Sequence, residues 1–164
     1  MTTVQEGRPA DAQERGATAH PIDARFAFRQ PVSSAGFVDA AWWPYTRELV
    51  NELASLLDTL WSSARDITRV TYNLDAWDAA PRRIRVNDRT VRLGGFRTSA
   101  PCMIRMSDAW GRERIDILVI PPATDPHVAE RALRLAAAAD SAWTGDQLLA
   151  MAARSDGPDV VRSR

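Results

Sequence analysis

The fold is decided by residues 114–122, which read RIDILVIPP. A strand over residues 114–120 places alternate side chains on opposite faces of a sheet. Apolar residues then occupy both faces, with Ile115, Ile117 and Val119 on one and Leu118 and Ile120 on the other. Because a strand of this kind is normally covered on both sides, we expect helices over one face. We expect Leu118 to be buried on the other, either by residues 25–29 or by a weak homodimer.

The residues before this strand predict a series of further strands. Alternating patterns indicate strands over residues 25–29, 37–43 and 67–74. One hairpin over residues 83–86 and 90–96 turns at Asn87-Asp88-Arg89, and a second pairs residues 102–106 with 114–120. The Gly94-Gly95 pair in the first hairpin is typical of a bulge or a bend.

Three stretches have the apolar spacing or the caps of helices. Residues 46–61 carry leucines three and four positions apart, the spacing of a helix that packs on a sheet. Asp125 is a typical N-cap, with Pro126 at the first helical position, for a helix that runs to about residue 139. Thr144 and Gln147 have the spacing of a capping box and predict a third, shorter helix.

This order of elements indicates the fold class. Hairpin-connected strands followed by helices predict an α+β fold, whereas a doubly wound fold needs helices between successive strands. We expect one domain over residues 23–153, with a mostly antiparallel sheet of about five to seven strands. Two long helices and one short C-terminal helix would accompany it. Residues 1–22 and 154–164 are polar and unpatterned, and we expect them to be disordered tails.

Composition excludes several chemistries. The 164 residues include 21 arginines, no lysine and 21 acidic residues, so no lysine Schiff base or Walker-type phosphate loop is available. Cys102 is the single cysteine, which excludes an internal disulfide and a thiolate-rich zinc site. We expect no metal and no cofactor. Without a secretory signal or a long apolar window, we expect a cytoplasmic protein with no membrane partner.

Several short motifs resemble a known family. They are GFVDAAWWP at residues 36–44, Trp77 followed by APRR at 80–83, VRLGGFR at 91–97 and IPP at 120–122. On these motifs the chain resembles domain-of-unknown-function family 5994, small actinobacterial proteins without an assigned activity, over about residues 23–140. The resemblance implies an actinobacterial cytoplasmic protein with one domain. It implies no catalytic residues, because the family has none established.

Charge is unevenly distributed along the chain. Residues 82–114 carry nine arginines against three acids, a net charge of +6, while residues 36–81 carry three arginines against seven acids, a net of −4. The first hairpin places Arg83, Arg85 and Arg92 on its outer face and Arg89 at its tip. Guanidinium groups on a strand face suit phosphate, on nucleic acid or on a small anion. The alternative is a solvated face that pairs with the acids of residues 36–81.

A second group of candidates lies near the turn from the second strand to the first helix. A carboxylate, an indole and guanidinium groups there would suit a planar or cationic ligand. The group comprises Asp39, Trp43, Arg47, Arg82 and Arg83. The alternative is structural, with Trp42 anchoring the core and Asp39 pairing with Arg82 or Arg83.

No residue stands out as catalytic. Cys102 alternates with Ile104 and Met106, so we expect a small buried hydrophobe rather than a nucleophile. His127 is expected to be an exposed residue at a helix start. We therefore favour a non-enzymatic binding or regulatory module whose partner is an unknown protein or an anionic ligand. Two alternatives stay open: binding of nucleic acid or a phosphate ligand through the arginine-rich hairpin, and a small enzyme that uses carboxylate and arginine chemistry.

Overall fold

The computed structural model describes residues 25–29, 38–138 and 143–154 of the chain. The tails expected over residues 1–22 and 154–164 lie outside these residues, apart from Arg154, which ends the last helix. The strands are β1 (Phe26–Phe28), β2 (Ala40–Trp42), β3 (Arg69–Asn73), β4 (Arg83–Val86), β5 (Arg89–Phe96), β6 (Met103–Ser107) and β7 (Arg114–Val119). The helices are α1 (Leu49–Ser62), α2 (Pro126–Ala137) and α3 (Gly145–Arg154). No helix in the described residues is long and apolar enough to cross a membrane.

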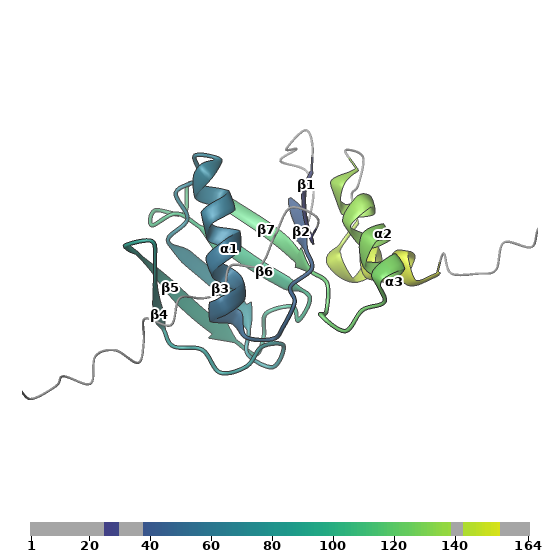
Figure 1. The fold of residues 1–164 in the computed structure, drawn as a ribbon, viewed down its shortest axis with the longest axis horizontal. Coiled ribbons are helices and arrows are strands. Elements are labelled where there is room, and N and C mark those ends of the chain that lie inside the picture. Colours follow the sequence, from purple (N-terminus) through teal and green to yellow (C-terminus); the bar gives the residue numbers. More distant parts are fainter. Residues whose placement is uncertain (1–24, 30–37, 139–142, 155–164) are drawn as a thin grey trace, which may run out of the picture.

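The strands form one mixed sheet in the order β1-β2-β7-β6-β3-β5-β4 (Figure 1). β2 runs parallel to β7 and β3 runs parallel to β5, while the other neighbours are antiparallel. The α+β class is therefore right, but the prediction of a mostly antiparallel sheet is wrong. The helices have 14, 12 and 10 residues, so the predicted division into two long helices and one short one is wrong as well.

Connectivity explains the parallel pairs. β2 and β3 flank α1 and run in the same direction, because α1 carries the chain across β7 and β6. After β3 the chain passes to the edge of the sheet as β4, and the hairpin then returns β5 into the space between β3 and β4. Each parallel pair thus follows from a crossover that hairpins alone do not supply.

The β4–β5 hairpin turns on two residues rather than three. Val86 pairs with Arg89, and the residues between them, Asn87 and Asp88, have φ of 47° and 63°. Positive φ at both central positions is the geometry of a type I′ turn, which suits the twist of a hairpin. Farther along β5, Gly94 and Gly95 pair in regular register with Thr71 and Tyr72, so the predicted bulge does not form.

Helix α1 covers one face of the sheet with its leucines. Leu53, Leu56, Leu57 and Leu60 are fully buried against alternate residues of strands β3 to β7. Trp42 also faces this core and stacks on Trp77, with 5.5 Å between ring centroids. Glu52 is buried too. Its carboxylate accepts hydrogen bonds from the backbone N–H groups of residues 45 and 46 ahead of the helix, and these bonds compensate for the lost contact with water.

The opposite face is covered at one end by α2 and α3. Leu118 and Ile120 are fully buried in a cluster with these helices, so the predicted burial of Leu118 is confirmed. Of residues 25–29, Ala27 packs against this cluster, whereas Phe26 and Phe28 pack on the α1 side; the weak homodimer stays a prediction. Gly145 permits the close approach of α3, because a Cβ there would lie 2.8 Å from the Met103 sulfur and 3.1 Å from Leu118.

Truncating one of the buried leucines of α1 tests how this helix packs on the sheet. Leu57→Ala removes a fully buried side chain, so we expect it to lower the free energy of unfolding by on the order of 2–4 kcal/mol through lost burial and a residual cavity. Leu74→Ala is the matched control, because Leu74 is 42% exposed and its truncation should cost less than about 1 kcal/mol. Chemical denaturation measures both. Equal losses would show that α1 does not pack on the sheet as described.

Candidate functional site

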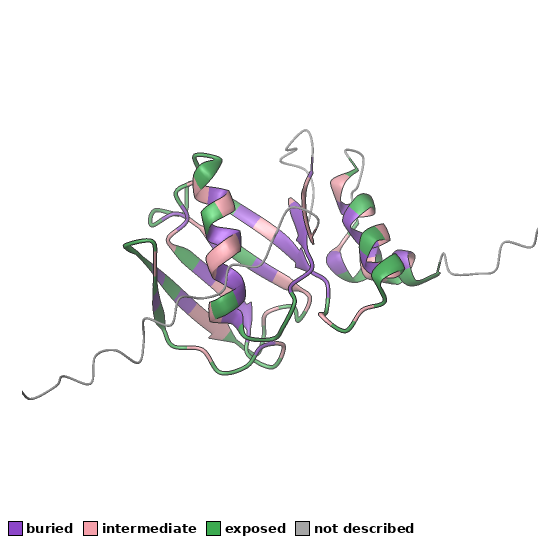
Figure 2. Ribbon diagram, viewed as in Figure 1, coloured by how far each residue is buried: buried purple, intermediate pink, exposed green. Residues whose placement is uncertain are grey.

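The face of the sheet opposite α1 is covered unevenly. α2 and α3 lie over the end formed by β1, β2 and β7 (Figure 1). Over β4, β5 and β3, the described part of the chain places no helix on this face. Buried and exposed residues alternate along these strands (Figure 2), with the buried ones facing α1. The exposed ones therefore form an open sheet face.

Arginine dominates this open face. Residues that alternate with the α1-facing core on β3 to β7 include six arginines and one acidic residue, Asp116. The arginines are Arg69, Arg83, Arg85, Arg92, Arg105 and Arg114. Three of them are cross-strand neighbours, since Arg92 pairs in register with Arg83 on one side and with Arg69 on the other. We call Arg83, Arg92 and Arg69 the arginine row.

The arginine row has no carboxylate partner among the described residues. The ion pairs on this face involve Arg85 with Asp88 at 3.6 Å, and Arg105 and Arg114 with Asp116 at 2.7 and 3.4 Å. Like charges directly opposite each other on neighbouring strands are destabilising. The row is thus a concentration of positive charge that the described chain does not neutralise.

A hollow of about 340 Å³ lies over the row. Its lining comprises Arg69, Val70, Thr71, Arg82, Arg83, Arg92, Leu93, Gly94 and Phe96. Phe96 is 53% exposed, which is unusual for a large aromatic ring that packs on a sheet. Its ring lies against Gly94, where an added Cβ would be 3.1 Å from the ring. The hollow therefore combines guanidinium groups with an accessible aromatic surface.

A second hollow, of about 420 Å³, continues along the same face toward α3. Thr71 lines both hollows, so they adjoin at the middle of the sheet. The second hollow is lined by Arg105, Arg114 and Asp116 on the strands and by Thr144 and Asp146 at the start of α3. Because Asp116 pairs with both of its arginines, this end is polar but less positive than the arginine row.

The candidate polyanion-binding residues divide between two surfaces. Arg83, Arg85 and Arg92 lie on the open sheet face, as expected of the outer face of the hairpin. Arg89 points elsewhere, since it pairs with Asp66 at 3.0 Å and its guanidinium lies 4.7 Å from the centre of the Trp61 ring. Sequence reasoning missed Arg69, although its alternation with the buried residues of β3 was a usable signal.

The second group of candidates is not brought together. Asp39 lies at the start of β2, where its carboxylate accepts a hydrogen bond from the backbone N–H of Asp116 at 2.9 Å. Arg82 and Arg83 lie at β4, five strands away, or roughly 24 Å at the usual spacing. The expected pairing of Asp39 with these arginines is therefore wrong. Trp43 is on yet another surface, buried beneath the guanidinium of Arg25, whose centre lies 3.8 Å from the ring centroid.

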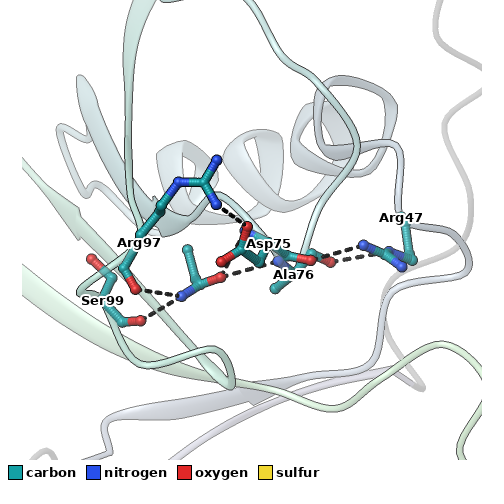
Figure 3. Close-up of polar contacts among 6 residues, drawn as sticks. Arg47, Asp75, Ala76, Arg97 and Ser99 are labelled. Atoms are coloured by element: carbon teal, nitrogen blue, oxygen red, sulfur yellow. Dashed lines mark hydrogen bonds and ion pairs between the residues drawn. The ribbon is translucent and has the colours of Figure 1, made fainter.

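Arg47 belongs to a network that joins three loops (Figure 3). Its guanidinium donates to the backbone carbonyls of Asp75 and Ala76. The buried Asn73 amide accepts from the N–H groups of the same two residues and donates to the carbonyls of Arg97 and Ser99. Arg47 also lines an apolar hollow of about 290 Å³ beside Trp77. Its hydrogen bonds hold loops in place, and neither Asp39 nor Trp43 lines that hollow.

The structure places Cys102 beside α3 and His127 in the first turn of α2. Cys102 precedes β6, so the strand alternation does not extend to it, and it packs with the α3 cluster rather than with Ile104 and Met106. It is half-buried rather than fully buried, and its thiol donates to Asp146. Burial, then this hydrogen bond and the carboxylate charge, raise the pKa of Cys102 to about 12. His127 is exposed in the first turn of α2, where its backbone N–H donates to the Asp125 cap.

Alkylation tests the environment of the thiol. Because the thiolate is the reactive form and the pKa is raised, iodoacetamide at pH 8 should modify native Cys102 on the order of a thousandfold more slowly than the unfolded chain. Asp146→Asn removes the nearby charge and should speed the native reaction, whereas Asp78→Asn, at an exposed position, should not. Mass spectrometry gives the rates. Equal rates for native and unfolded protein would contradict the described burial.

Comparison with known proteins gives one match. The model of the Family of unknown function (DUF5994) matches residues 25–136, which include all seven strands, α1 and most of α2. No curated protein and no solved structure matches the chain. Because the match spans more than half of the sequence, the chain belongs to the DUF5994 family, a family of unknown function.

Proposed function

We propose that this protein is a non-enzymatic module that binds phosphate-bearing polyanions on its open sheet face. The observation that carries the proposal is the arginine row, in which Arg92 lies between Arg83 and Arg69 with no carboxylate partner among the described residues. A bound polyanion would relieve the repulsion within the row. Guanidinium groups also suit phosphate, since their planar donors match its oxygens.

The main alternative is that acids from residues 36–81 neutralise these arginines. The contacts of those acids argue against it. Asp66 pairs with Arg89 and Asp75 pairs with Arg97. Asp39 bonds to the backbone of β7, and Glu52 bonds to the loop ahead of α1. These four carboxylates therefore bond to groups other than the arginine row, and no ion pair among the described residues joins an acid of residues 36–81 to it.

Neutralising the arginine row tests this function. We expect the triple variant Arg69→Gln, Arg83→Gln and Arg92→Gln to lose retention on a phosphate matrix and affinity for inorganic polyphosphate. Its binding should also depend less on salt, with the slope of log K against log salt reduced by about two to three, because each lost phosphate contact removes released counterions. Its melting temperature should stay equal or rise, because the substitutions remove repulsion between adjacent like charges.

The matched control carries the same change in charge on other surfaces. Arg89→Gln, Arg134→Gln and Arg154→Gln remove three exposed arginines, from the start of β5, from α2 and from the end of α3. This control should bind polyphosphate with nearly the affinity of the parent protein. Equal losses in both triple variants would mean that net charge alone governs binding, and the proposal would then fail. Unchanged binding in the first variant would also overturn it.

A further inference from the structure

We infer that the polyanion bound on the open sheet face is a single-stranded nucleic acid, one of whose bases stacks on Phe96. This inference rests on the proposed function and names its ligand. A phosphate polymer without bases would need only the arginine row. The structure adds an exposed aromatic ring to the lining of the same hollow, and that ring is the reason for choosing a nucleic acid.

The position of Phe96 suits stacking. β5 directs the ring to the same face as Arg92, four residues earlier on the strand. The absence of a side chain at Gly94 leaves room for the ring against the backbone. Aromatic side chains beside a positive groove are how many proteins hold single strands, because every base offers a π-face while the groove contacts the backbone.

The shape of the face favours a single strand over a duplex. In a duplex the bases are stacked on one another, so a ring on a protein surface reaches them only after unstacking. The arginine row crosses three neighbouring strands, or roughly 10 Å at the usual spacing, and the adjoining hollow continues past Thr71 toward α3. A short single strand can place a phosphate over the row and an unpaired base over Phe96 at the same time.

The second hollow adds groups that bond to sugars and bases rather than to phosphate. Hydroxyl and carboxylate groups line it, on Ser99 between β5 and β6 and on Thr144 and Asp146 at the start of α3. Asp116 offsets the charge of Arg105 and Arg114 there, so this end attracts phosphate less than the arginine row does. We therefore place the phosphates at the β4–β5–β3 end and the unpaired bases along the track from Phe96 toward α3.

The test compares probes with and without bases. Fluorescence anisotropy measures binding of 12-nucleotide oligo(dT) and oligo(U), a 12-base-pair duplex and, by competition, inorganic polyphosphate. We expect both single strands to bind more tightly than the duplex. Phe96→Leu keeps an apolar side chain but removes the aromatic face, and it should weaken both single strands about tenfold. Phe96→Trp should retain their affinity. Neither variant should change the affinity for polyphosphate.

Tyr45→Leu is the control, because it also removes an exposed aromatic ring but from a different surface. Tyr45 is 38% exposed and lies against Arg25, away from the open sheet face, so its loss should leave oligonucleotide affinity unchanged. Circular dichroism checks that each variant is folded. A tighter complex with oligo(U) than with oligo(dT) would identify RNA as the preferred ligand, and the reverse would identify DNA, both within the inference.

Other outcomes separate the two proposals. Unchanged oligonucleotide affinity in Phe96→Leu, with binding lost in the arginine triple variant, would overturn the stacking inference and leave the phosphate function standing. A duplex bound as tightly as the single strands would also overturn the inference. Failure of every probe to bind would overturn both proposals. A dimer by light scattering that dissociates in the triple variant would instead assign the open sheet face to contact between copies of this chain.

Discussion

β7 must be covered on both of its faces, and the arrangement of the molecule follows from that requirement. Its residues face α1 on one side and the pair α2 and α3 on the other. One 14-residue helix lies over the first face. The two C-terminal helices, of 12 and 10 residues, cover the second face only at the end formed by β7, β2 and β1. Burial of apolar surface drives this packing, so the helices lie over the strands that are apolar on both sides.

The remainder of the second face stays open to solvent because most of its residues are polar or small and gain little from burial. β3, β4 and β5 present arginine, threonine and glycine there, with Phe96 as the large apolar exception. Such a face is compatible with water, yet its charge is not balanced where Arg92 lies between two other arginines. The proposed polyanion site therefore lies on the part of the second face that α2 and α3 do not cover.

Local sequence patterns predicted most elements, and the long-range pairings were not predictable from them. The stripe of leucines, the alternation in each strand and the Asp125 cap all locate elements to within a few residues. Hairpin reasoning then gave the β4–β5 and β6–β7 pairs correctly. It missed the parallel pairs, because β2–α1–β3 is a crossover and because β5 inserts beside β3 only once the whole sheet has formed. Nothing local to either strand specifies such a neighbour.

The candidate site shows the same division. The outer face of the hairpin was predictable from residues two apart, so Arg83, Arg85 and Arg92 were found. Arg69 joins them only through the parallel β3–β5 register. Charge alone favours Asp39 and Arg82 as partners, yet they lie near opposite edges of the sheet. Phe96 is a candidate because it lines the same hollow as the arginine row. That hollow is formed by three strands together, so the sequence around Phe96 does not predict it.

The most direct test of the central claim is an NMR titration that follows the side-chain Nε–H signals of individual arginines as 12-nucleotide oligo(dT) is added. If the arginine row binds the phosphates, the signals of Arg69, Arg83 and Arg92 should shift together and saturate. Those of Arg89 and Arg97, which are paired with Asp66 and Asp75, should stay in place. Equal shifts at all five arginines, or shifts confined to Arg89 and Arg97, would contradict the account.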